Sequence, residues 1–319
     1  MGGEIYYLYL KNIKNDTGLI SVMKKCTLLG GAMKSEIQTH RQHYIPKNLI
    51  LKRFVDEKNQ IQAYNIESDS FFTTNPNNLF VERDLYEFRD LDGQILLPNA
   101  TENLYANIEC FLAGMLDELL ESINNATDNI LPVENEACMT MIIAMLSVRH
   151  PDKRKLFRGK DDEGIFKLIN ELHYQHSIVG GGHVNKFIKE LNIPDEISQA
   201  FEGQSPFEYF TSWLLNNCWF SAGIIKGDRC FYLSDSPVLI LNGIDIKYAL
   251  PVSSKICMYV SEMNNDKYKG ACQIIEATDD TIDKINEKSV LNSKKIIASQ
   301  GYSEKDKIFI RDVLSKVDS

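Results

Sequence analysis

The segment PNATENLYANIECFLAGMLDELLESI, residues 98–123, marks the point at which the chain changes character. Pro98 ends a series of short β-prone runs, and Asn99 followed three residues later by Glu102 resembles a capping box at a helix start. Apolar residues then recur at helical spacing, which predicts an amphipathic helix over residues 101–124. The residues on this apolar face are Leu104, Ile108, Phe111, Leu112, Met115, Leu119 and Ile123.

Short strands are predicted before this helix, over residues 43–97. Several runs there alternate apolar and polar residues or are rich in aromatic residues, and turn signals such as Asp92-Gly93 separate them. This pattern is typical of a small antiparallel sheet. After the long helix, residues 133–149 form a second helical segment that is apolar nearly all round. Such a helix is expected to be buried.

The rest of the chain repeats this order of strands and helices. Further helices are predicted up to residue 217, strands over residues 219–276, and two last helices over residues 279–299 and 303–316. Because strands and helices come in separate runs, the sequence favours an α+β fold. We expect antiparallel β-sheet segments flanking a central α-helical bundle.

The domain organisation follows from the lack of a long Pro- or Ser-rich linker. We expect residues 33–319 to form a single α+β domain, with Gly180-Gly181-Gly182 as the only candidate joint. Residues 1–32 are interpreted as an N-terminal extension that is either flexible or adds an edge strand. The parts of the domain are residues 43–97 (strands), 99–217 (helices), 219–276 (strands) and 279–316 (helices).

Composition and charge narrow the class of protein. The chain has 319 residues, of which 44% are hydrophobic and 25% charged, an ordinary composition for a globular protein. Its formal charge of -9 disfavours a broad nucleic-acid coat but leaves room for a local basic cleft. The seven cysteines form no CxxC pair, which favours free thiols in a reducing cytoplasm. With no long apolar run, a membrane partner is not expected.

The richest polar stretch is His40-Arg41-Gln42-His43-Tyr44-Ile45-Pro46, which leads into Leu51-Lys52-Arg53-Phe54. Pro46 favours an extended backbone before it, so the two histidines would not share a face. A divalent metal would therefore need further ligands from elsewhere in the chain. The alternatives for His43 are a hydrogen-bonded structural residue or an acid–base group, and His40 is expected at the surface.

Two charged residues lie within predicted helices. Glu109 stands beside the apolar face of the long helix, either as a solvated side chain or as a site residue with a perturbed pKa. Arg149 ends the apolar helix just before His150-Pro151. A cation there suits the helix dipole, but an arginine for binding phosphate or carboxylate is the alternative.

A further candidate is Asp235 in the turn Ser234-Asp235-Ser236-Pro237. Aspartate in a turn often binds backbone N–H groups, and the alternative is a catalytic or metal-binding residue held by the sheet. Familiar catalytic patterns such as G-x-S-x-G, H-E-x-x-H and G-x-G-x-x-G are absent, and the glycines before His183 lack the P-loop pattern.

The chain carries, in this order, the motifs His43-Tyr44-Ile45-Pro46, Leu51-Lys52-Arg53-Phe54, Glu82-Arg83-Asp84-Leu85-Tyr86, Ile108-Glu109, Arg149-His150-Pro151, Trp219 with Ser234-Asp235-Ser236-Pro237, and Leu250-Pro251-Val252-Ser253. This series resembles a microbial family catalogued as domain of unknown function 4238, over about residues 38–315. The spacing from His43 to Phe54 is one residue longer than we expect for the family, so Lys52 and Arg53 are both kept as candidates. The resemblance implies a shared fold and no established activity.

Two functions are predicted from the polar constellation. The first is a phosphoester hydrolase, a nuclease-like effector in a defence or toxin setting, in which His43, Glu109 and Asp235 are catalytic. Its substrate, a nucleic acid or nucleotide in a local cleft, would be bound by a second set of residues. The alternative is a non-catalytic module for an anionic ligand or a protein partner. The substrate-binding candidates are Tyr44, Lys52, Arg53 and Arg149.

Overall fold

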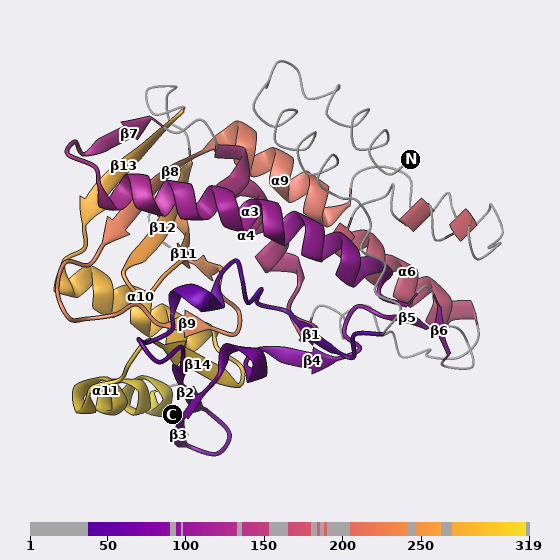
Figure 1. Ribbon diagram of the computed structural model, residues 1–319, viewed down its shortest axis with the longest axis horizontal. Coiled ribbons are helices and arrows are strands. Elements are labelled where there is room, and N and C mark those ends of the chain that lie inside the picture. The colour runs from indigo at the N-terminus through magenta and orange to yellow at the C-terminus, as the bar shows by residue number, and fades with distance from the viewer. Residues whose placement is uncertain are drawn as a thin grey trace. The chain divides into compact units, whose positions relative to one another are not determined.

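The computed structural model describes residues 38–89, 94–96, 98–132, 136–152, 165–179, 184–185, 188–189, 205–241, 246–262 and 270–316 (Figure 1). The predicted extension 1–32 and the glycine joint lie outside the described residues. Two compact units can be distinguished, so the single domain stays a prediction. Unit 1 comprises the described residues up to Tyr44, Glu82–Leu112 and Ala137–Leu215, and unit 2 comprises Ile45–Val81, Ala113–Glu136 and the described residues from Asn216 onward.

Unit 2 contains a six-stranded sheet that is antiparallel except where β13 pairs parallel with β8. β12 and β8 pair along their whole lengths, from Ile256 opposite Ile224 to Glu262 opposite Cys218. β12 is buried from Ile256 to Ser261, as expected for a central strand rich in branched and apolar residues. In sheet order the strands are β10 (Leu239–Ile240), β11 (Ile246–Pro251), β12 (Ile256–Glu262), β8 (Cys218–Ile224), β13 (Ala271–Glu276) and β7 (Ile130–Pro132).

A second, four-stranded sheet in unit 2 joins segments from both ends of the chain. In its hairpin of β2 and β3, Ile61 and Ala63 on β2 are fully buried, as the alternation in the sequence predicts, and Tyr64 is buried as well. Its third strand pairs with β2 on one side and β9 on the other. In sheet order the strands are β3 (Ser70–Thr74), β2 (Ile61–Asn65), β14 (Ile296–Ser299) and β9 (Leu233–Ser234).

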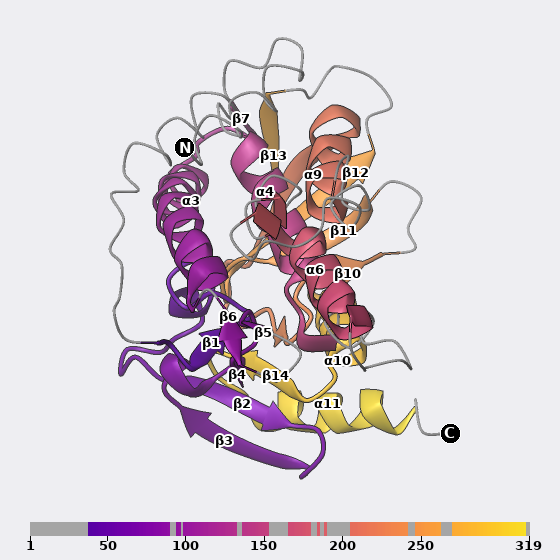
Figure 2. The same ribbon diagram turned by 90° about the vertical axis from the view of Figure 1, so that its right-hand side faces the viewer.

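Two helices complete unit 2, α10 (Asp279–Asn292) and α11 (Glu304–Ser315). A capping box starts α11, in which the side chains of Ser303 and Asp306 each bind the other's backbone N–H. The α11 helix lies beside the β2–β3 hairpin (Figure 2), where the Arg311 Nε lies 2.8 Å from the Asp69 carboxylate.

The α+β class is confirmed, and two details of the prediction are wrong. The helix predicted over residues 279–299 ends at Asn292, because Ile296–Ser299 finds two strand partners and buries Ile297 completely. The predicted sheet over residues 43–97 is not one sheet, because β2 and β3 join β14 while the other strands form separate ribbons. The central helical bundle stays a prediction.

Unit 1 holds most of the helical residues together with two short ribbons (Figure 1). In α4, every residue from Ala137 to Leu146 is buried, which confirms the expected burial of this apolar helix. None of the helices in the described ranges is long and apolar enough to cross a membrane. The elements are β1 (Arg41–His43) paired with β4 (Val81–Arg83), β5 (Phe88–Arg89) paired with β6 (Ile95–Leu96), and the helices α3 (Ala100–Asn124, which continues into unit 2), α4 (Glu136–Val148), α6 (Ile165–Val179) and α9 (Pro206–Asn217).

Candidate active site

The candidate site in unit 1 is built around Arg149, one residue beyond the end of α4. Its side chain is 1% exposed. The Nε atom donates to the Tyr86 hydroxyl at 2.7 Å, and Nη2 donates to the main-chain carbonyl oxygen of His43 at 2.8 Å. The Nη1 atom forms an ion pair with the Glu109 carboxylate. Burying a guanidinium is costly unless such partners satisfy it, so these contacts fix its position.

Two tyrosine rings enclose the guanidinium. Its central carbon lies 4.0 Å from the ring centroid of Tyr105 and 5.1 Å from that of Tyr86, within the range of favourable cation–π contacts. Burial raises the pKa of Tyr86 well above its usual value, although the charge of Arg149 opposes this shift. The Tyr86 hydroxyl therefore stays protonated, and it donates a hydrogen bond to the His43 carbonyl oxygen at 3.2 Å.

Glu109, on α3, is held by one of its two carboxylate oxygens. Oε1 accepts from Arg149, and Oε2 has no hydrogen-bond partner among the described residues. The side chain is 18% exposed. Arg149 thus orients the side chain of Glu109 and leaves its second oxygen available.

Glu102 lies two turns before Glu109 on the same helix and has a different environment. Its Oε2 atom is buried and has no hydrogen-bond partner among the described residues. Burial raises the pKa of Glu102 to about 7, with a smaller push in the same direction from the charges of Glu109 and Glu87, while Arg149 acts against it. An unpartnered buried carboxyl group favours its protonated form for this reason.

A third carboxyl group, Glu87, is 2% exposed and fully engaged in hydrogen bonds. Its oxygens accept from the Gln42 Nε2 atom at 2.7 Å and from the Asn99 backbone N–H at 3.2 and 3.3 Å. Burial raises the pKa of Glu87, and these hydrogen bonds oppose the rise. The Gln42 Oε1 atom in turn accepts from the Tyr86 backbone N–H at 2.7 Å. This network fixes the backbone of the Arg149 partner Tyr86.

The Tyr86 backbone is also held from α6. Gln175 is fully buried, and its Nε2 atom donates to the Tyr86 carbonyl oxygen at 3.0 Å while its Oε1 atom accepts from the Thr101 hydroxyl at 2.7 Å. The capping box predicted for Asn99 and Glu102 is wrong. The Asn99 N–H binds Glu87, and the Glu102 Oε2 atom has no hydrogen-bond partner among the described residues.

Both polar residues of the His43-Tyr44 pair contribute to the site. His43 does so through its carbonyl oxygen. The Tyr44 ring meets the His150 ring edge-to-face, with centroids 5.5 Å apart. The Nδ1 atom of His150 accepts from the Asp152 backbone N–H at 3.1 Å. The structure therefore brings together four predicted site residues, His43, Tyr44, Glu109 and Arg149.

His40 is placed at the surface, as expected. Its side chain is 47% exposed, and its Nδ1 atom lies 2.8 Å from the carboxylate of Asp84. Asp84 is itself buried and also binds Arg89 at 3.0 Å. His40 thus belongs to a salt-bridge cluster around Asp84.

Lys52 and Arg53 lie in unit 2, where they share one carboxylate. The Lys52 Nζ and Arg53 Nη2 atoms approach the two oxygens of Asp117 at 2.7 and 2.5 Å. Burial acts to raise the pKa of Asp117, but the two cations outweigh it and lower the pKa. Arg53 also donates to the carbonyl oxygen of Ala113 at 3.1 Å. A substrate-binding role for this pair stays a prediction.

Asp235 also lies in unit 2, and it is 1% exposed. Its carboxylate accepts the backbone N–H groups of Lys294 at 2.9 Å, Lys295 at 2.7 Å and Ile296 at 3.1 Å. These three donors offset the cost of burying the carboxylate. Through them, Asp235 fixes the connection between α10 and β14. A catalytic or metal-binding role for Asp235 stays a prediction.

Metal binding and thiol reactivity depend on how His, Cys, Asp and Glu side chains are grouped and buried. Within the ranges that the structure describes, no group of three or more His, Cys, Asp or Glu side chains converges as a metal site would require. Burial raises the pKa of Cys218 and of Cys272 to about 12, which leaves both thiols protonated at neutral pH.

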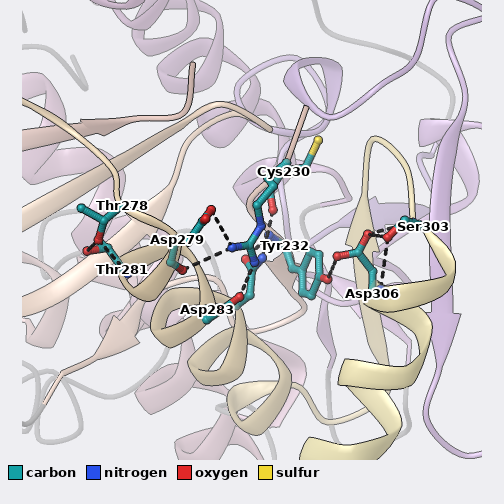
Figure 3. Close-up of polar contacts among 10 residues, drawn as sticks. Cys230, Tyr232, Thr278, Asp279, Thr281, Asp283, Ser303 and Asp306 are labelled. Atoms are coloured by element: carbon teal, nitrogen blue, oxygen red, sulfur yellow. Dashed lines mark hydrogen bonds and ion pairs between the residues drawn. The ribbon is translucent and has the colours of Figure 1, made fainter. Parts of the chain in front are cut away.

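Unit 2 contains another dense polar cluster, between α10 and α11 (Figure 3). The Tyr232 hydroxyl donates to Asp306 at 2.6 Å. Arg229 pairs with Asp279 at 3.1 Å and also with Asp283. Asp279, Asp283 and Asp306 are each bound to a partner within the cluster, so the contacts join the two helices to the segment that precedes β9.

Sequence reasoning missed three residues of the site, Tyr86, Glu87 and Glu102. Two signals were available: the motif that ends at Tyr86, and the spacing of Glu102 and Glu109, which places both on one side of a helix. Burial of Glu87 depends on Gln42 and Asn99, which are 45 and 12 positions away, and local patterns do not reveal such contacts.

The fold and these contacts define an α+β protein in which widely spaced short motifs meet around a buried arginine. The chain belongs to the family described as "Protein of unknown function (DUF4238)", which matches residues 41–302. The resemblance found in the sequence is thereby confirmed. Searches among curated proteins and among solved structures each found no match.

Proposed function

We propose that this protein is a hydrolase of phosphoester bonds and that its reacting groups lie in unit 1 around Arg149. The observation that carries the proposal is the state of Glu109. Arg149 binds one of its oxygens, while the other has no partner among the described residues and the side chain is partly exposed. A glutamate side chain that an arginine orients in this way can accept a proton from an attacking water molecule.

Each neighbour of Glu109 has a role in this proposal. Arg149 orients Glu109 and has one Nη2 N–H without a partner among the described residues, which is a donor for a phosphate oxygen. Tyr86 and the His43 carbonyl oxygen hold the guanidinium in place. Because phosphoryl transfer depends on positioning and charge stabilisation, a fixed arginine beside a carboxylate supports this reaction class.

The narrower form of the proposal is a nuclease-like effector in a defence setting. Its substrate would be a nucleic acid or nucleotide, and the free thiols of the described cysteines support a site of action in the reducing cytoplasm. The same preparation should be tested on a small phosphodiester and on single-stranded DNA or RNA. Hydrolysis of the small phosphodiester alone would support only the general form, and hydrolysis of the nucleic acid as well would support the narrower one.

The test is hydrolysis of bis(4-nitrophenyl) phosphate, with and without added Mg²⁺ or Mn²⁺. We expect Glu109→Gln to lower kcat by about 100- to 1,000-fold, because the variant lacks the proton acceptor. Glu118→Gln is the matched control, since Glu118 is exposed on the same helix and outside the site. Equal rates for wild type and Glu109→Gln would overturn the proposal.

A second candidate is the non-catalytic module. It is favoured by the 1% exposure of Arg149 and by the three backbone donors of Asp235, because side chains so enclosed can serve stability alone. In that case the wild type would not hydrolyse any phosphoester above the background rate, and Arg149 variants would change only the free energy of unfolding.

A further inference from the structure

Two carboxyl groups on α3 interact with Arg149 but differ in their hydrogen bonds: Glu109 forms an ion pair with Arg149, and the buried Glu102 Oε2 atom has no hydrogen-bond partner among the described residues. We propose that Glu102 is the proton donor of the site and acts as the general acid opposite Glu109. This inference rests on the proposed hydrolase function and adds to it a second reacting group.

The hydrogen bonds separate the roles of the two residues. Glu109 is ion-paired with Arg149 through one of its carboxylate oxygens. The buried Oε2 atom of Glu102 has no hydrogen-bond donor within the described ranges, so a negative charge there lacks the hydrogen bonds that would offset the cost of burial. Environments that push two neighbouring carboxyl groups apart in this way mark one as acid and the other as base.

The charged groups around Glu102 come from three parts of unit 1. Glu109 on α3 and Glu87 before β5 favour its protonated form, as does burial, and Arg149 after α4 favours its ionised form. Tyr86 also interacts with it electrostatically. The outcome is a pKa of about 7, at which a carboxyl group can give up a proton and regain it under physiological conditions.

The spacing also suits a displacement reaction. Seven residues along a helix correspond to about 10 Å, with both side chains on one side. In phosphoryl transfer the attacking and leaving oxygens lie on opposite sides of phosphorus. An acid and a base that serve these two oxygens must therefore be separated by the width of the reacting group, as two helical turns allow.

The proposed step balances in atoms and protons. Water attacks phosphorus as Glu109 takes one of its protons, and the bond from phosphorus to the leaving oxygen breaks. Glu102 gives its proton to that oxygen, so the products are a phosphate monoester and an alcohol. Glu109 then releases its proton to water and Glu102 regains one, which restores both groups.

The state of Glu102 can be measured without any substrate. In protein labelled with ¹³C at the glutamate carboxyl carbons, the signal lost in Glu102→Gln belongs to Glu102. We expect it to titrate near pH 7 in the wild type. In Glu109→Gln it should titrate at lower pH, because a repelling charge is gone and Arg149 is released. Titration near the ordinary value of 4.5 would overturn the inference and leave the role of Glu109 untouched.

The donor role is tested by the leaving group. A 4-nitrophenyl phosphodiester needs little help from an acid, whereas an alkyl phosphodiester must have its leaving oxygen protonated. We expect Glu102→Gln to lose at least about 100-fold more activity on the alkyl ester than on the nitrophenyl ester. Equal losses would mean that Glu102 serves only the structure, and they would overturn the inference.

The two proposals can fail separately. If the wild type hydrolyses neither ester, the hydrolase function fails and the donor role fails with it, whatever the titration shows. If the wild type is active, and either Glu102→Gln loses equal activity on the two esters or Glu102 titrates near pH 4.5 in the wild type, only the inference about Glu102 fails.

Discussion

The carbonyl oxygen of His43 accepts a hydrogen bond from Arg149 at 2.8 Å, across 106 positions of the sequence. The contact joins the His43-Tyr44-Ile45-Pro46 motif to the Arg149-His150-Pro151 motif, and the rings of Tyr44 and His150 meet beside it. Two motifs that are separate in the sequence are thus parts of one site.

The first prediction concerns the cost of losing Arg149. Replacing it with methionine leaves Glu109 without its cation and the His43 carbonyl oxygen without a charged donor. We expect Arg149→Met to lower the free energy of unfolding by about 3–5 kcal/mol, as breaking buried pairs does. Urea denaturation monitored by circular dichroism measures this change.

The matched control for this variant is Arg83→Met, because the Arg83 side chain is 78% exposed. Its effect should stay within about 0.5 kcal/mol. Equal destabilisation by the two variants would show that the contacts of Arg149 contribute nothing beyond an exposed salt bridge.

The second prediction concerns pH. The pKa of Glu102 is raised from 4.5 in the unfolded chain to about 7 in the folded protein. Between these pH values the folded state binds a proton at Glu102 that the unfolded chain has lost. The contribution of Glu102 to stability is therefore highest below pH 4.5 and is lost as the pH rises through 7. This contribution of Glu102 to the free energy of unfolding changes by at most about 3 kcal/mol over that range.

Glu102→Gln removes this titration. We therefore expect the variant to be more stable than the wild type at pH 8, with the advantage shrinking toward pH 5. Urea denaturation at both pH values provides the comparison. An advantage that is the same at pH 5 and pH 8 would contradict a raised pKa for Glu102.

The third prediction concerns the centre of the six-stranded sheet in unit 2. A Cβ atom added at Gly223 on β8 would lie 2.6 Å from the hydroxyl oxygen of Tyr259 on β12, and that side chain is buried. We expect Gly223→Ala to destabilise the protein by about 1–3 kcal/mol through overpacking. Gly227→Ala is the control, because nothing lies within 4 Å of its added Cβ; a similar loss there would count against the steric explanation.

The sequence predicted those elements whose pattern is local and strong. The long helix and helix α11 were predicted to within a residue or two of Ala100–Asn124 and Glu304–Ser315, because the spacing of their residues defines them. Strand β14 was mistaken for the end of a helix. Its conformation depends on pairing with β2, more than 200 positions earlier, which no local pattern reveals.

The site was predictable only in part. Glu109 and Arg149 stood out because charged residues on apolar helices need partners. Their mutual pairing depends on how α3 and α4 pack, and the burial of Glu87 depends on Gln42. The raised pKa of Glu102 depends on burial and on its distance from three other charges. Such quantities arise only from the folded chain.

The fourth prediction concerns Asp235. In the wild type, the carboxylate accepts hydrogen bonds from three backbone N–H groups. An asparagine at this position keeps one oxygen acceptor but places an amide N–H donor against these backbone donors. We expect Asp235→Asn to lower the free energy of unfolding by about 1–3 kcal/mol. The control is Asp228→Asn in an exposed loop, which should change it by less than about 0.5 kcal/mol. Equal losses in the free energy of unfolding for the two variants, measured by denaturation, would contradict the role of Asp235 in fixing the start of β14.

The central claim is that Glu109, oriented by Arg149, activates water for attack on phosphorus. Hydrolysis of bis(4-nitrophenyl) phosphate in ¹⁸O-labelled water tests it most directly, with the products analysed by mass spectrometry. For the wild type we predict one ¹⁸O atom in the phosphate product and none in the nitrophenol, and for Glu109→Gln a formation rate lower by about 100- to 1,000-fold. Label in the nitrophenol, or labelled phosphate formed equally fast by Glu109→Gln, would contradict the claim.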